Sequence, residues 1–221
     1  MDVTRREFLC CAAVTTAALG TRRPARRAPP GATCVVLDLG EQCALRESLE
    51  GYRSALAAAQ TVAGSVLIVP AALSIGGAAA RRIVRHVDDG GRLILESGAT
   101  FAAPESQAFR EHRDALRELF GLQVEPPQPV VRDRMRVPYV EFRWPSPTLV
   151  RDFTAIVPVA SRDDERIAHV GDTPVALVRR RGRGMLIFLG SPIGPALWAG
   201  DAEARRWLHE VLRQAPIAIS A

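Results

Sequence analysis

From residue 33 onward, the hydrophobic positions alternate between two spacings that predict alternating strands and helices. Apolar runs with the length and β-branched composition of strands buried on both faces occur at 33–38, 65–70 and 92–95. Between them, residues 44–60 and 77–87 place their apolar side chains on helical spacing, and a double glycine follows the second helix. This order of strands and helices predicts a parallel sheet with right-handed crossovers and flanking helices.

The second half of the chain has a less regular pattern. A further helix is expected over 105–120, and residues 122–160 contain seven prolines, which favours loops and edge strands inserted before the sheet resumes. Residues 173–190 read as a β-hairpin, and 202–214 as a last helix with Asp201 as its N-cap. The pattern predicts one α/β domain over 33–221, built as three layers around a mostly parallel sheet with a late hairpin.

The N-terminus carries the pattern of a twin-arginine export signal. The matching residues are Arg5, Arg6, Phe8 and Leu9. The apolar stretch that follows, 8–20, is too short to span a bilayer, so we expect a signal peptide over 1–20 rather than a stable transmembrane helix. Residues 21–32 are basic and proline-rich, as in a disordered tether. The sequence predicts recognition by the twin-arginine translocase and a periplasmic or extracellular mature protein; the alternative is an ordinary first helix.

The positive charge of the chain is concentrated in this leader. The net charge is +5, and residues 1–27 hold six arginines against two acids, which leaves +1 for the remainder. A nearly neutral body argues against a nucleic-acid partner. Every basic residue is arginine, so mechanisms that need a lysine, such as Schiff-base chemistry, are excluded.

Neither the histidines nor the cysteines form a recognisable cofactor motif. Four histidines are scattered along the chain: His86, His112, His169 and His209. No C-x-x-C is present, so we expect no metal and no other cofactor. Cys34 and Cys43 remain after the leader, and an extended strand from 34 to 39 covers roughly 17 Å, which argues against a disulfide between them.

Three stretches together resemble the class I glutamine amidotransferase-like superfamily. They are SVLIVPAALSIGGAAARRIVRHVDDGGRLIL, GRGMLIFLGSP and GDAEARRWLHEVL. The likeness is to non-amidotransferase branches, such as trehalose-utilisation-type proteins and the middle domain of some bacterial β-galactosidases. It implies a flavodoxin-like arrangement of the sheet.

The same resemblance implies a nucleophile after the strand that follows the double glycine. Glu96-Ser97-Gly98 stands there, so Ser97 takes the place of the family's cysteine, with Glu96 as a weak second candidate. Where glutamine-hydrolysing members have a histidine, this chain has Gly190-Ser191-Pro192. A serine nucleophile needs a base within hydrogen-bond reach, and the sequence assigns none, so a plain turn at Ser97 is favoured.

These observations favour an exported, non-catalytic domain that binds a small polar ligand, such as a carbohydrate, or a protein partner. Its expected site is the carboxyl edge of the parallel strands, at Asp38, Ser97, Gly98 and Ser191. Two alternatives stay open: a serine hydrolase that uses Ser97, and an accessory subunit exported together with a partner enzyme.

Overall fold

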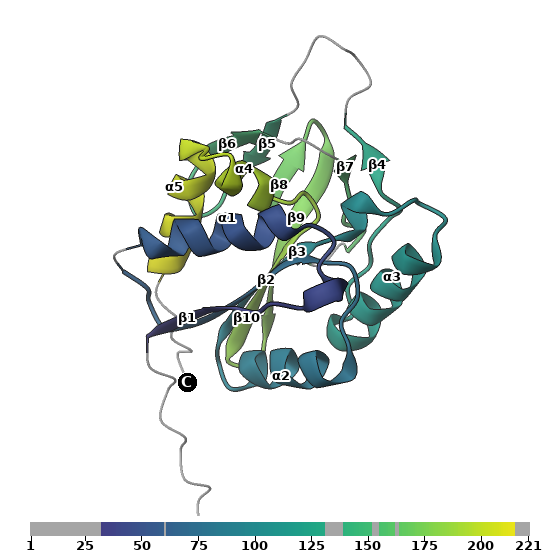
Figure 1. Cartoon of the computed structure of the whole chain (residues 1–221), viewed down its shortest axis with the longest axis horizontal. Helices are drawn as coiled ribbons and strands as arrows, with labels where there is room; N and C mark the ends of the chain where they lie inside the picture. The colour runs from purple at the N-terminus through teal and green to yellow at the C-terminus, as the bar shows by residue number, and fades with distance from the viewer. Residues whose placement is uncertain (1–31, 60, 131–138, 152–154, 162–163, 215–221) are drawn as a thin grey trace, which may run out of the picture.

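The computed structural model describes residues 32–59, 61–130, 139–151, 155–161 and 164–214. The predicted signal peptide and most of the predicted tether lie outside these ranges. The described residues include an eight-stranded sheet. Figure 1 shows helices on both of its faces. None of the helices in these ranges is long and apolar enough to cross a membrane.

The first half of the chain follows the predicted alternation of strands and helices. Its elements are β1 (Thr33–Val36), α1 (Arg46–Ala57), β2 (Ser65–Ala72), α2 (Gly77–Asp88), β3 (Arg92–Ser97) and α3 (Gln107–Phe120). Two short 3₁₀ turns, η1 (Gly40–Gln42) and η2 (Ala99–Phe101), follow β1 and β3. Gly121 ends α3 in the left-handed conformation, as its place after the apolar pattern indicated.

The second half contains more strands than the pattern predicted. Its elements are β4 (Gln128–Pro129), β5 (Tyr139–Phe142), β6 (Thr148–Arg151), β7 (Ala155–Ile156), β8 (Glu165–Val170), β9 (Thr173–Arg181), β10 (Gly184–Leu189), α4 (Gly194–Trp198) and α5 (Ala202–Arg213). The hairpin of β9 and β10 and the helix α5 are confirmed, and Asp201 caps α5 by accepting two backbone N–H groups. The strand β8 and the helix α4 were not predicted, because β8 is half polar and α4 is only five residues long.

The main sheet is half parallel and half antiparallel. Its order is β1-β2-β3-β10-β9-β8-β5-β6; the first four strands are parallel, and every later pair is antiparallel. The expectation of a mostly parallel sheet is therefore correct only for the half that contains β1 to β3 and β10. The antiparallel half is built from the hairpin and from strands in and after the proline-rich segment, which pair without crossover helices.

One strand is less buried than its composition suggested. The run at 33–38 was expected to be buried on both faces, but β1 is the terminal strand of the sheet, and Val35 is 42% exposed. Cys34 and Cys43 both carry free thiols, as the length of the extended strand indicated.

Two hydrophobic cores lie on opposite faces of the sheet. On one face, α1 and α5 contribute Tyr52 and Trp207 to a core with Ile68 and Ile94 of the strands. On the other face, the alternate strand residues pack against apolar side chains of α2 and α3. These include Leu67, Leu95, Ile83, Val87, Phe109 and Leu116. Figure 1 shows α1, α4 and α5 on one side and α2 and α3 on the other.

The two crossovers of the parallel half have opposite hands. The chain steps from β1 to β2 and on to β3 in the same direction across the sheet, yet α1 lies on one face and α2 on the other. One of the two crossovers is therefore left-handed, although the general rule for parallel strands predicts that both are right-handed. This exception matters for the carboxyl edge of the sheet, because it determines the face toward which each connection turns.

Candidate functional site

The carboxyl edge of the parallel strands has two places where neighbouring connections diverge to opposite faces. The connections after β1 and β10 lead to α1 and α4 on one face, and those after β2 and β3 lead to α2 and α3 on the other. Ligands of open α/β sheets bind in crevices at such divergences. The two possible sites are therefore the β1–β2 crevice and the β3–β10 crevice.

The side chain of Glu96 fills the β3–β10 crevice. It is fully buried, and its carboxyl group lies on the face of the sheet that α1 and α4 cover. Its carboxyl group accepts the backbone N–H of Gly194, at the start of α4, at 2.7 Å, and the N–H of Ala71 at 2.9 Å. The hydroxyl of Tyr52 on α1 donates to it at 3.4 Å. One carboxyl group thus joins β2, β3, α1 and α4 at the place where a ligand would otherwise lie.

Tight packing of α4 on α1 closes this crevice further. A Cβ atom on Gly51 would lie 2.4 Å from the carbonyl oxygen of Gly194 and 2.7 Å from the backbone nitrogen of Trp198. A Cβ atom on Gly194 would lie 2.4 Å from the Ser48 hydroxyl. Both positions therefore need glycine, and the contact between the helices leaves no space above Glu96.

Burial changes the acidity of Glu96 and of its neighbour. Loss of solvent raises the pKa of Glu96 from 4.5 to about 7, and the N–H groups of Gly194 and Ala71 act in the opposite direction. Burial, followed by the nearby Glu96, raises the pKa of Tyr52 well above its ordinary value. In the folded protein, Glu96 therefore keeps its proton to a higher pH than an exposed glutamate does.

The backbone at Ala71 is also unusual. Ala71 has a φ of +39°, a conformation that residues other than glycine seldom adopt. Gly98 packs against it so closely that a Cβ atom there would lie 2.2 Å from the Ala71 carbonyl oxygen. The hydrogen bond from Ala71 to Glu96 and the contact with Gly98 hold this turn in place.

Ser97 has a histidine partner that the sequence did not assign. On the face opposite Glu96, the Ser97 hydroxyl lies 2.9 Å from Nε2 of His112 on α3, and it also accepts the N–H of Ala99 at 3.3 Å. Burial lowers the pKa of His112 from 6.5 to about 4, and the backbone of Leu73 acts in the opposite direction. The imidazole is therefore neutral, and its lowered pKa makes it a weaker base than an exposed histidine.

This Ser97–His112 pair is sealed inside the protein. Both side chains are fully buried, and Glu96 points to the other face of the sheet, so it cannot orient His112. The sequence did contain a signal for the direction of His112. It shares the buried, helically spaced positions of α3 with three apolar residues: Phe109, Leu116 and Phe120. A histidine on that stripe faces the sheet.

Of the four residues expected at the ligand site, only Asp38 is accessible. Ser97 and Gly98 are buried, and Ser191 is 2% exposed. Asp38 lies beyond β1, at the mouth of the β1–β2 crevice, so the structure separates it from the other three.

The β1–β2 crevice is an open hollow of about 500 Å³. Its walls are the loop after β1 and the first turns of α2: Leu37, Asp38, Leu39, Gln42, Gly76, Gly77, Ala78, Ala79 and Arg82. The Asp38 carboxylate accepts the N–H of Gly40 at 2.8 Å and lies within 3.4 Å of the guanidinium groups of Arg46 and Arg53. These contacts, the Gly40 hydrogen bond first, lower the pKa of Asp38, so it is ionised at neutral pH.

The opposite wall of the crevice offers hydrogen-bond donors. The first turn of α2 contains no acidic residue, and no side chain caps it, so its first N–H groups have no partner within the helix. Gln42 accepts the N–H of Gly76 at 3.3 Å, which places its amide at the wall of the hollow. The crevice thus combines a carboxylate, an amide, backbone donors and the side chain of Arg82. In the described ranges no three Asp, Glu, His or Cys residues gather where a metal ion could be held.

Similarity to known proteins is seen only at the level of structure. No protein-family model matches the sequence, and no curated protein does. A cytoplasmic protein from Salmonella typhimurium LT2 shares 11% identity at a TM-score of 0.55, over 79% of this chain and 88% of that one.

Two similar structures are β-galactosidases. A GH42 β-galactosidase from G. stearothermophilus shares 14% identity at a TM-score of 0.54, and one from Bacillus circulans shares 17% at 0.53. These matches cover 85% and 83% of this chain, and in each case the chain spans 31% of the galactosidase. At these identities the likeness establishes a shared fold with one part of a glycoside hydrolase.

The two buried titrating groups give a pH prediction. Between pH 4.5 and 7, folded Glu96 keeps a proton that the unfolded chain has released, so its contribution to stability falls as the pH rises. Between pH 4 and 6.5, unfolded His112 holds a proton that the folded form lacks, so its contribution to stability rises with pH. The two contributions oppose each other, each of the order of 3 kcal/mol.

Single substitutions should separate them. We expect the free energy of unfolding of the Glu96→Gln variant to rise between pH 4 and 6.5. That of the His112→Gln variant should fall between pH 4.5 and 7. Urea unfolding at a series of pH values measures both, after circular dichroism has verified the folds. Parallel profiles for the two variants would contradict the prediction.

Proposed function

We propose that this protein is an exported, non-catalytic member of the amidotransferase-like superfamily that binds a small carbohydrate in the β1–β2 crevice. The observation that carries the proposal is the contrast between the two divergence points of the sheet. The β3–β10 crevice is occupied by the carboxyl group of Glu96, and the β1–β2 crevice is open and lined by polar groups.

The chemistry of the β1–β2 crevice suits a sugar. Its walls carry an ionised carboxylate, Asp38, and an amide, Gln42, which bind hydroxyl groups as acceptor and donor. A few convergent polar groups in a hollow of this size are typical of small-molecule sites. The fold likeness to two β-galactosidases supports a role in carbohydrate binding and gives galactosides as the first compounds to test.

Titration of the mature protein with lactose tests the site. We expect NMR chemical-shift changes in the loop after β1 and in the first turn of α2, because these segments line the crevice. Asp38→Asn should weaken binding about tenfold, because the sugar loses a charged hydrogen-bond acceptor. Asp114→Asn, which removes another ion-paired surface aspartate on α3, is the matched control and should bind as the wild type does. No shift changes at the crevice with any sugar tested, neutral or acidic, would refute this site.

A second function, hydrolysis by Ser97, is favoured by one specific contact, the 2.9 Å distance to His112. Burial of both groups argues against it, because a substrate has no access to the hydroxyl. We therefore expect that a fluorophosphonate leaves the native protein unlabelled, measured by mass spectrometry. Rapid labelling at Ser97, abolished in Ser97→Ala, would instead establish a serine hydrolase and overturn the non-catalytic proposal.

The export part of the proposal depends on residues 1–20, with 21–32 as the tether. Replacing the motif pair by Arg5→Lys and Arg6→Lys keeps the charge of the leader and removes the guanidinium groups of the signal. We expect the precursor to accumulate in the cytoplasm of a host with the twin-arginine translocase, measured by cell fractionation. Unchanged export, or export of the wild type in a host lacking that translocase, would show that another route is used.

A further inference from the structure

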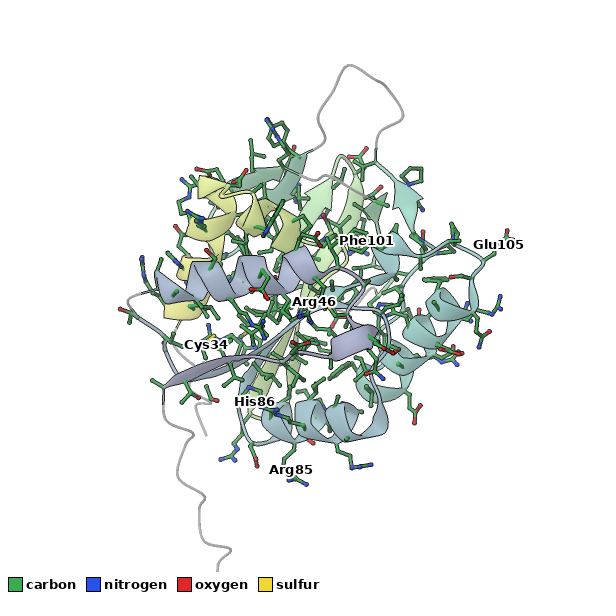
Figure 2. The ribbon with its side chains drawn as sticks, viewed as in Figure 1. Cys34, Arg46, Arg85, His86, Phe101 and Glu105 are labelled. Atoms are coloured by element: carbon green, nitrogen blue, oxygen red, sulfur yellow. The ribbon has the colours of Figure 1, made fainter. Side chains whose placement is uncertain are left out.

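One exposed face of α2 carries a concentration of positive charge. Arg81, Arg82 and Arg85 are all exposed, and Figure 2 shows Arg85 pointing away from the body of the protein. Within the described residues, no carboxylate forms a salt bridge with any of the three. This differs from most other helices of the protein, where surface arginines such as Arg53 and Arg117 pair with an acid one turn away.

The neighbouring charges offset this face only in part. Asp88 is held by Arg181 at 3.0 Å, and Asp89 lies one helical turn beyond Arg85, so one carboxylate stands against three guanidinium groups. Burial lowers the pKa of His86, while the contact of its Nε2 with the carbonyl oxygen of Arg92, at 3.0 Å, acts in the opposite direction. The three arginines therefore form a local positive surface on a body whose net charge outside residues 1–27 is +1.

This surface is continuous with the β1–β2 crevice. A second hollow of about 400 Å³ runs along α2 and is lined by Ala78, Arg81, Arg82, Arg85, His86 and Asp89. It shares Ala78 and Arg82 with the crevice. Arg81 and Arg85 are one helical turn apart, so the positive groups follow the axis of α2 for about 5 Å beyond the crevice.

We infer that the carbohydrate bound here is acidic, an oligosaccharide whose sugar units carry carboxylate groups. The inference rests on the proposed function and extends it. A first unit would place its hydroxyl groups against Asp38 and Gln42 and its carboxylate toward Arg82. The next unit would lie along α2 and present its carboxylate to Arg81 and Arg85. Arg46 and Arg53 offset the charge of Asp38, so that an anion can approach this wall.

Two trisaccharides of equal length separate charge from shape. We expect trigalacturonate to bind the mature protein more tightly than galactotriose by about tenfold at low salt, and to lose that advantage at high salt. The double variant Arg81→Gln/Arg85→Gln, whose residues line the second hollow and not the crevice, should weaken trigalacturonate binding about tenfold and change galactotriose binding less than about twofold. Arg205→Gln/Arg213→Gln on α5 removes the same charge from the opposite face of the sheet and is the matched control. Isothermal titration calorimetry measures the affinity of the wild type and of both double variants for each trisaccharide.

The outcomes distinguish this inference from the function on which it rests. If galactotriose binds at the crevice and trigalacturonate binds no better, the ligand is neutral, and only the inference fails. An equal loss in the α5 variant would show a general charge effect and would also overturn it. If vesicles containing phosphatidylglycerol bind through Arg81 and Arg85 while trigalacturonate does not, the face contacts lipid and the inference is wrong. If neither trisaccharide binds, both proposals fail.

Discussion

The arrangement of the carboxyl edge depends on the burial of one carboxyl group. Glu96 is surrounded by donors, the N–H groups of Ala71 and Gly194 and the hydroxyl of Tyr52, which belong to a strand turn and to two helices. Removing a carboxyl group from water is costly unless its oxygens are hydrogen-bonded. The elements that supply these donors therefore have to remain together, and the centre of the edge stays closed.

This closure changes what the edge can do. In an enzyme, N–H groups at this kind of edge stabilise an anionic ligand or intermediate. Here Glu96 itself is the acceptor, so the N–H groups of Ala71 and Gly194 are already used. The Ser97–His112 pair, on the other face, is within hydrogen-bond distance but lies under the packed side chains of α3 and the sheet. Of the two crevices, the outer one is where polar side chains, Asp38 and Arg82, remain accessible.

The outer crevice follows from the topology rather than from any motif. It exists because α1 and α2 leave neighbouring strands toward opposite faces, which opens the edge between β1 and β2. The same divergence leaves the first turn of α2 at the wall of the crevice. The crevice is therefore a product of one unusual crossover.

The sequence by itself determined the elements with strong periodicity. β2, β3, α2, α3, α5 and the hairpin of β9 and β10 were all predicted, because burial on two faces or on one stripe leaves a readable pattern. Whatever depends on contacts between distant residues was decided only by the tertiary structure. Strand order, the hand of the crossovers and the meeting of Ser97 with His112 are of this kind, since local spacing carries no information about them. The role of Glu96 is the clearest case: its sequence position suggested chemistry, and only its neighbours show that it closes the fold.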